Sequence, residues 1–262
     1  MKELITRAIS GILYVALLTI TMFSSPLSFY CLIIVFAGLA LWEFQRLIKF
    51  ESLVVPFALA VLFLTTYLSL LPTVFFDGIL FASLAVNAII SFLCLTNRQV
   101  DFSKGSKTAL ILFYITGSSI FIPKLLGLNA PGEPYYLLFF YLAIWVNNSF
   151  AYLVGSRIGK TKLLPAISPK KSWEGYAGGA VATIILLYFV ENNFSLYGDY
   201  WWGVALIIPA LATLGDFVQS YFKRRANVKD SGTLLPGHGG FYDRMDSVIF
   251  TAPFYFLLLK FI

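Results

Sequence analysis

Three carboxylates in the C-terminal part of the sequence have the type and spacing to bind a metal ion. Asp243 and Asp246 are three residues apart, which on a helix places them on one face, with Cβ atoms about 5–6 Å apart. Asp216 lies inside an apolar run shortly before Lys223, and a carboxylate in hydrocarbon needs a compensating partner. Hard oxygen ligands with room for substrate phosphates favour Mg²⁺. A salt-bridge network with the neighbouring basic residues is the alternative interpretation.

The loop before these acids is rich in glycine. Residues 236–240 read PGHGG and contain the single histidine of the chain, His238. Glycine accepts backbone angles that other residues refuse, so the N–H groups of Gly239 and Gly240 could approach a phosphate closely. His238 could donate to a phosphate oxygen or satisfy a loop carbonyl, and the sequence leaves both open.

A second polar segment covers residues 144–175. Asn148 lies within an apolar run, where an amide must face another helix or a wet cavity. Lys170 and Lys171 come just before an expected helix start, whose free N–H groups and partial positive charge suit phosphate. A helix cap beside basic residues that only set membrane orientation explains the pattern equally well. The glycines of the following helix favour close packing against a neighbouring helix; they are Gly175, Gly178 and Gly179.

The composition indicates a helical protein that crosses the membrane several times. Of 262 residues, 59% are hydrophobic and 12% are charged, whereas a soluble domain has about 25% charged residues. A helix needs about 20 apolar residues to cross the hydrocarbon. The sequence therefore predicts an all-α bundle of about nine transmembrane helices, near 4–23, 27–44, 53–71, 78–96, 108–126, 135–154, 175–190, 200–222 and 245–262.

The distribution of basic residues predicts the orientation of this bundle. If the N-terminus is cytoplasmic, 17 of the 19 Lys and Arg residues lie in inside segments, and only Lys124 and Lys260 fall outside. This asymmetry follows the positive-inside rule. A basic inner face beside anionic lipid also accounts for the net charge of +6, so we expect no nucleic-acid partner.

The polar segments resemble the signature of a known enzyme family. The residues that carry the likeness are Ser220-x-Phe222-Lys223-Arg224, then Lys229-Asp230-x-Gly232, then Pro236-x-His238-Gly239-Gly240-Phe241-x-Asp243-Arg244-x-Asp246. They resemble the signature of phosphatidate cytidylyltransferases (CDP-diacylglycerol synthases). GKTKL at 159–163 and ISPKKSWEG at 167–175 resemble the second motif of that family. The likeness is sharp over residues 145–247, whereas the first 130 residues share only apolar spans.

The resemblance implies an integral membrane enzyme of phospholipid biosynthesis. Its substrates would be CTP and phosphatidic acid, and its products CDP-diacylglycerol and pyrophosphate. The resemblance also implies Mg²⁺ dependence, with a second cation left open, a homodimer among membrane lipids, and a location in the bacterial cell (inner) membrane with the active site facing the cytoplasm. Residues 1–130 would form a structural, lipid-facing and dimer-forming part. Residues 131–262 would form the catalytic part, with cytoplasmic loops 155–174 and 223–246.

Motif positions assign roles to individual residues. The metal ligands would be Asp216, Asp243 and Asp246, which with Lys223 and Arg224 form the expected catalytic set. The expected substrate-binding residues are Asn148, Arg157, Lys160, Ser168, Lys170, Lys171, Ser220, Lys229, Asp230, His238, Gly239, Gly240 and Arg244.

Two residues depart from the family pattern. Asn148 and Gln219 stand where the family usually has Asp and often has Glu. Each replaces a carboxylate by its amide, so activity could be altered; an amide oxygen binds a cation without contributing charge.

Two rival functions remain. A CTP-dependent enzyme acting on another lipid, either polyprenol kinase-like or an archaeal-type lipid cytidylyltransferase, could keep a similar polar corner. A cation-coupled transporter would also hold acids within its helices, but around a midplane site. The one-sided distribution of polar residues favours an enzyme.

Overall fold

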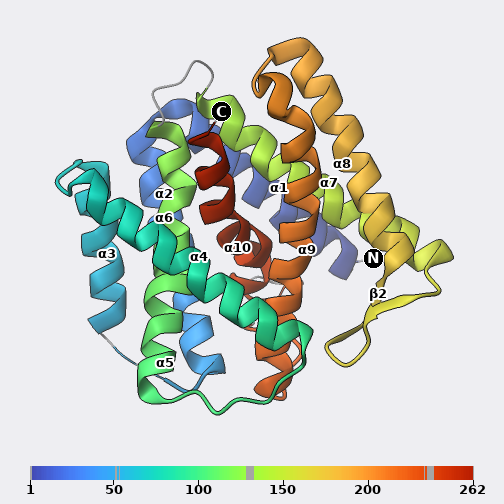
Figure 1. The fold of residues 1–262 in the computed structure, drawn as a ribbon, viewed down its shortest axis with the longest axis horizontal. Helices are drawn as coiled ribbons and strands as arrows, with labels where there is room; N and C mark the ends of the chain where they lie inside the picture. The colour runs from blue at the N-terminus through green and yellow to red at the C-terminus, as the bar shows by residue number, and fades with distance from the viewer. Residues whose placement is uncertain are drawn as a thin grey trace.

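The computed structural model describes residues 2–50, 52, 54–127, 133–232, 234 and 239–261. Within these ranges the chain is a bundle of long helices, with a small hairpin at one end (Figure 1). The elements are α1 (Lys2–Ser24), α2 (Pro26–Leu47), α3 (Val54–Tyr67), α4 (Thr73–Leu95), α5 (Lys104–Ala109), η1 (Leu110–Gly117), α6 (Ser118–Lys124), η2 (Leu125–Gly127), α7 (Glu133–Ile158), β1 (Lys162–Leu164), β2 (Ser168–Ser172), α8 (Trp173–Phe194), η3 (Gly198–Tyr200), α9 (Trp201–Arg225) and α10 (Tyr242–Leu259).

Each predicted span coincides with a helical segment, and the fifth is built from α5, the π-helix η1 and α6 in succession. Among the described residues, six of these segments are long and apolar enough to cross a membrane. The described apolar parts of α1 and α3 are shorter. α10 is not one of the six, and its first turns carry Asp243, Arg244 and Asp246. The chain is thus a polytopic membrane protein.

The predicted all-α fold is confirmed, with one small element that was not predicted, at residues 162–172. Here β1 and β2 form an antiparallel hairpin, in which Lys162 pairs with Ser172 and Leu164 with Ser168. The carboxylate of Glu174 accepts hydrogen bonds from the backbone N–H groups of Lys160 and Thr161 and so closes the open end of the hairpin. The polar segment before α8 is therefore an ordered strand pair, which places its lysines at defined positions.

The predicted role of the α8 glycines in helix packing is confirmed. A Cβ atom on Gly175 would lie 2.6 Å from the carbonyl oxygen of Ala151, and one on Gly179 would lie 2.6 Å from that of Asn147. Such distances are too short for any side chain. α8 can therefore pack tightly on α7, which brings the hairpin and α7 together.

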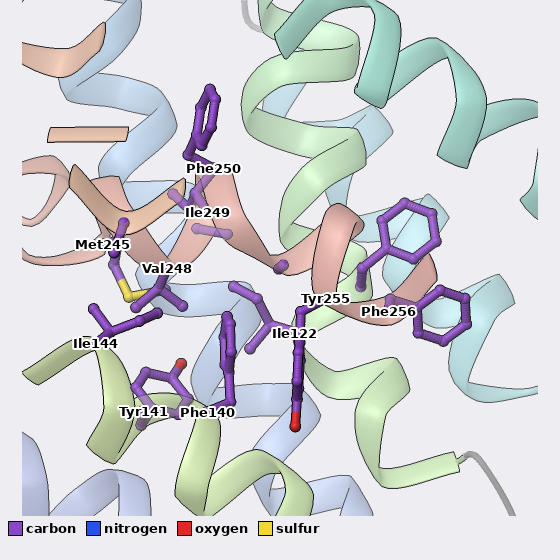
Figure 2. Packing of buried hydrophobic residues seen from close by; sticks show 14 of the residues in the cluster. Ile122, Phe140, Tyr141, Ile144, Met245, Val248, Ile249, Phe250, Tyr255 and Phe256 are labelled. Carbon is purple, nitrogen blue, oxygen red and sulfur yellow. The ribbon is translucent and has the colours of Figure 1, made fainter. Parts of the chain in front are cut away.

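α10 lies in the middle of the bundle (Figure 1), where it packs against α9, α6, α2 and α4. Figure 2 shows Tyr141 and Ile144 of α7 close to Met245 and Val248 of α10, all of them buried. Because apolar side chains surround α10 on several sides, its position is fixed, and the acids in its first turns are held at the centre of the protein.

Candidate active site

The larger cavity of the site, which we name the hairpin cavity, lies between α7, the β1–β2 hairpin, α8, α9 and α10. Its volume is about 680 Å³. Three lysines from the hairpin and three aspartates from α9 and α10 line it, so charges of both signs face the same space. The charged and amide side chains of its wall are Asn148, Lys162, Lys170, Lys171, Asp216, Asp243, Arg244 and Asp246.

A second space, the α1 cavity, lies between α1, α7 and α10 and has a volume of about 390 Å³. Its wall is more apolar and includes Tyr14, Val15 and Trp145. Four residues line both cavities: Asn148, Asp243, Arg244 and Asp246. The two cavities therefore meet at a shared group of polar side chains.

Asp216 and Asp246 both face the hairpin cavity. An oxygen of Asp216 lies 2.6 Å from the ammonium of Lys171, and Ser220 Oγ lies 3.4 Å from its other oxygen. Asp246 is only 8% exposed. The pair of Lys171 and Asp216 agrees with the salt-bridge interpretation of this acid, and the cavity wall also leaves both carboxylates beside the space where a ligand would lie.

Asp243 has a different environment, because both of its carboxylate oxygens accept hydrogen bonds from the protein. Oδ1 accepts from Lys223 Nζ at 2.7 Å and from Gln219 Nε2 at 2.8 Å. Oδ2 accepts from the N–H and hydroxyl groups of Ser231, each at 2.9 Å, and from the N–H of Gly240 at 3.0 Å.

The pKa of Asp243 reflects these contacts. Asp243 lies in the first turn of α10, before the apolar stretch at 245–262. Burial raises its pKa, but Lys223 and the backbone N–H groups more than offset this, so the pKa lies below its usual value.

These contacts test how well the predicted metal ligands fit an ion. Within the described ranges, no group of three His, Cys, Asp or Glu side chains is arranged to hold a metal. Both oxygens of Asp243 already accept hydrogen bonds, Oδ1 from side chains of α9 and Oδ2 from the loop before α10, so Asp243 does not suit the role of a metal ligand. Asp216 and Asp246 remain suitable, since both are oxygen donors on one cavity wall. Mg²⁺ commonly binds through one or two carboxylates together with substrate phosphates.

Comparison with known proteins identifies the family. A family model described as "Cytidylyltransferase family" matches residues 5–262. The chain belongs to this family. It is 33% identical to the phosphatidate cytidylyltransferase of Bacillus subtilis (strain 168) over the full length of both chains. It is also 45% identical to that of Staphylococcus aureus (strain COL) and 42% identical to that of Staphylococcus haemolyticus over 129 residues, about half of each chain.

Several residues expected to bind substrate in this member of the cytidylyltransferase family do not line either cavity. Among the described side chains, Arg157, Lys160, Lys229 and Asp230 are exposed and line neither cavity. Ser168 begins β2, where it pairs with Leu164. His238 falls outside the described residues. The cavities thus bring together the expected residues Asn148, Lys170, Lys171, Asp216, Asp243, Arg244 and Asp246.

Other expected contacts are made to the protein itself. Arg224 Nε donates to the carbonyl of Ile167 at 3.2 Å and so ties α9 to the hairpin. Gly239 has a φ of +83°, a backbone conformation that favours glycine. The N–H of Gly240, expected to meet phosphate, donates to Asp243. In this structure these residues shape the site, and their predicted contact with substrate stays a prediction.

Gln219, one of the two departures from the family pattern, has a defined partner. Its amide donates to Asp243 Oδ1, which an ionised glutamate could not do. The amide of Gln219 therefore adds a second donor to the Asp243 carboxylate without adding a negative charge, so Lys223 has only one carboxylate to neutralise.

Sequence reasoning missed residues from the N-terminal half and one lysine of the hairpin. Lys162 lines the hairpin cavity, and Tyr14 of α1 lines the α1 cavity. Glu43 of α2 accepts hydrogen bonds from Ser231, Phe241 and Tyr242. The only available signal for Glu43 was a carboxylate at the end of the predicted span 27–44, a position that membrane-interface charges also occupy.

Proposed function

We propose that the protein transfers the cytidylyl group of CTP to phosphatidic acid, giving CDP-diacylglycerol and pyrophosphate in phospholipid biosynthesis. The family supports this proposal, and so does the match to the phosphatidate cytidylyltransferase of Bacillus subtilis over the full length of both chains. The structural observation that carries it is the meeting of two cavities of different character at one group of polar residues. Such an arrangement suits a reaction between a nucleotide and a lipid.

The hairpin cavity suits CTP. Lys162, Lys170 and Lys171 bring positive charge to its wall. Ser172 caps α8 by accepting a hydrogen bond from the N–H of Gly175, so the N-terminus of α8, which attracts anions, lies at the same wall. A triphosphate would therefore be neutralised by side chains and by the helix together.

The α1 cavity suits phosphatidic acid. Tyr14, Val15 and Trp145 offer an apolar surface to the glycerol and the first acyl carbons, and Arg244 lies where it could meet the phosphate. Ile9, Ile12 and Leu13 of α1 are exposed on the outside of the bundle, as side chains that face lipid would be. A phospholipid could reach this cavity sideways from the membrane.

The reaction does not require a general base. A phosphate monoester has a second pKa of about 6, so phosphatidic acid offers an anionic oxygen at neutral pH. That oxygen forms a bond to the α-phosphorus of CTP while the bond to the bridging oxygen breaks and pyrophosphate leaves. The barrier lies in bringing two anions together, and such transfers are catalysed chiefly by positioning and by neutralising charge. The lysines of the hairpin cavity would stabilise the leaving pyrophosphate.

We propose Mg²⁺ as the cofactor, held by Asp216 and Asp246, with a second ion left open. When bound, Mg²⁺ would neutralise phosphate charge between the substrates. Asp243, by contrast, would orient Lys223 and the first turn of α10.

The proposal extends to orientation and assembly. A cytoplasmic N-terminus places the hairpin and the basic end of α9 on the cytoplasmic side, where CTP is found; the charge asymmetry of the loops supports this. The bacterial relatives support a location in the bacterial cell membrane. A homodimer is the assembly implied by the family resemblance.

Product analysis tests the function. The purified protein is incubated with CTP, phosphatidic acid and Mg²⁺, and the lipid extract is analysed by mass spectrometry. CDP-diacylglycerol with pyrophosphate is the expected result. CDP with a newly phosphorylated lipid would instead indicate a kinase, and an absence of any CTP-dependent product would overturn the proposal.

A further inference from the structure

Glu43 is a buried acid of α2 that contacts the signature segment from the other half of the chain. It is only 1% exposed. Its oxygens accept hydrogen bonds from the backbone N–H of Phe241 at 3.1 Å, from that of Tyr242 at 2.9 Å and from Ser231 Oγ at 2.7 Å. α10 has no side-chain cap of its own at Phe241, so Glu43 supplies from α2 the acceptor that the free N–H groups of this helix start require.

Two glycines of the signature leave room for this carboxylate. A Cβ atom on Gly232 would lie 2.3 Å from Glu43 Oε1, and one on Gly240 would lie 2.1 Å from Glu43 Oε2. Gly232 has no positive φ, so its backbone conformation alone does not demand glycine. The space taken by Glu43 explains why these positions carry no side chain.

The same carboxylate is connected to the charged groups of the cavity. Ser231 Oγ lies 2.7 Å from Glu43 and 2.9 Å from Asp243, and Asp243 holds Lys223 at 2.7 Å. The hydroxyl of Ser231 has only one hydrogen, so the two carboxylates compete for it, and a change at one acid alters the hydrogen bond to the other. Asp246 lies on the turn of α10 that follows the N–H groups bound by Glu43.

We propose that Glu43 is a positioning residue for cytidylyl transfer, fixing Ser231 and the start of α10 so that Asp246 faces the hairpin cavity in the reactive arrangement. The inference rests on the proposed function. Glu43 touches neither cavity among the described lining residues, and it acts through Ser231 and the α10 backbone. Through Glu43, the N-terminal helices would contribute to catalysis as well as contact lipid.

The experiment compares Glu43→Gln with a matched control on the same helix. Glu43→Gln keeps the shape but turns an NH₂ donor toward N–H and O–H donors. The control is Gln45→Ala, since Gln45 is also buried on α2 but contacts Ser52. For each protein, kcat and KM for CTP and phosphatidic acid are measured, and hydrogen–deuterium exchange is followed over residues 239–247 without substrate.

We expect Glu43→Gln to lower kcat at least tenfold, to change both KM values less than threefold, and to speed exchange in 239–247. Glu43→Asp keeps the negative charge and should retain more activity than Glu43→Gln. Gln45→Ala should keep kcat within twofold of wild type. Wild-type kcat in Glu43→Gln, or equal losses in Glu43→Gln and Gln45→Ala, would overturn the inference.

A second variant covers the case in which Glu43→Gln does not fold. Ser231→Ala removes only the hydroxyl between the two acids and leaves the bonds from Glu43 to α10. It should lower kcat several-fold at an unchanged melting temperature, and wild-type kcat would count against the inference. The exchange measurement needs no substrate. If the wild type forms no CDP-diacylglycerol, the proposed function fails, whereas unchanged exchange in Glu43→Gln contradicts the positioning role independently.

Discussion

The carboxylate of Glu43 occupies the space where a side chain on Gly232 would begin, 2.3 Å from the Cβ position. The next two atoms near that position also belong to Glu43. The acid of α2 and the glycine of the loop are therefore complementary in shape although about 190 residues separate them in the sequence.

This complementarity predicts a coupling between the two positions. Gly232→Ala should lower the apparent Tm because a methyl group overlaps the buried carboxylate; overpacking of this kind costs about 1–3 kcal/mol. In a Glu43→Ala background the same change should have a smaller effect, with a coupling energy of about 0.5–3 kcal/mol. Thermal unfolding of the four proteins in detergent measures it. The control is Gly38→Ala on α2, because a Cβ atom on Gly38 would meet no atom within 4 Å. Additive shifts in Tm for Gly232→Ala and Glu43→Ala would contradict the prediction.

Mutation of the two aspartates of α10 should affect activity and stability differently. Asp246→Asn should lower cytidylyl transfer about 100-fold, as loss of one electrostatic group at a reacting centre does, with the fold retained. Asp243→Asn should also lose activity, but it should destabilise the protein by about 3–5 kcal/mol, because it leaves Lys223 without its partner and opposes donors to an NH₂ group. Activity and melting temperature are measured together. Equal melting temperatures for the two variants would show that Asp243 does not hold the loop.

The sequence predicted the helices well because apolar length is a local property. Every predicted span has a helical counterpart, and the α8 glycines pack as expected. The hairpin was not predicted, since residues 162–172 are short, polar and rich in lysine and show no strand alternation. Its order depends on Glu174, which accepts from two backbone N–H groups at the hairpin end.

The sequence brought several of the residues that line the hairpin cavity into one expected set, although their roles stay predictions and most of their contacts were not predicted. Asp216, Asp246, Lys170 and Lys171 lie on one cavity wall as expected. The saturation of Asp243 by donors could not be read from spacing, because its partners come from α9 and from the loop before α10. Glu43 was missed for the same reason. Its role is set by tertiary contacts across about 190 residues, and a single carboxylate at a helix end has many ordinary explanations.

Replacing Gln219 by Glu should make stability depend on pH. At neutral pH the new carboxylate cannot donate to Asp243 Oδ1, which Gln219 does at 2.8 Å. Loss of this donor should destabilise the protein by about 1–3 kcal/mol. As pH falls and the new Glu gains a proton, it can donate again, so the stability difference from wild type should shrink. Thermal unfolding between pH 5 and 8 measures this, with Gln219→Met as a control of similar size that cannot donate at any pH. Parallel pH profiles for the Glu and Met variants would refute the prediction.

Replacing Asn148 by Asp should lower the Mg²⁺ concentration needed for transfer. Asn148 lines both cavities with Asp246, and its Oδ1 accepts a hydrogen bond from Asn147 Nδ2 at 3.1 Å, a contact that a carboxylate keeps. A negative charge there adds a hard oxygen ligand beside the two proposed ones, and cation affinity rises with ligand charge. We expect the Mg²⁺ concentration for half-maximal activity to fall severalfold, with kcat unchanged or higher. Titration of the initial rate with Mg²⁺ for both forms is the measurement. Superimposable titrations would place Asn148 too far from the cation to affect it, and a higher Mg²⁺ requirement would show that the amide is needed as it stands.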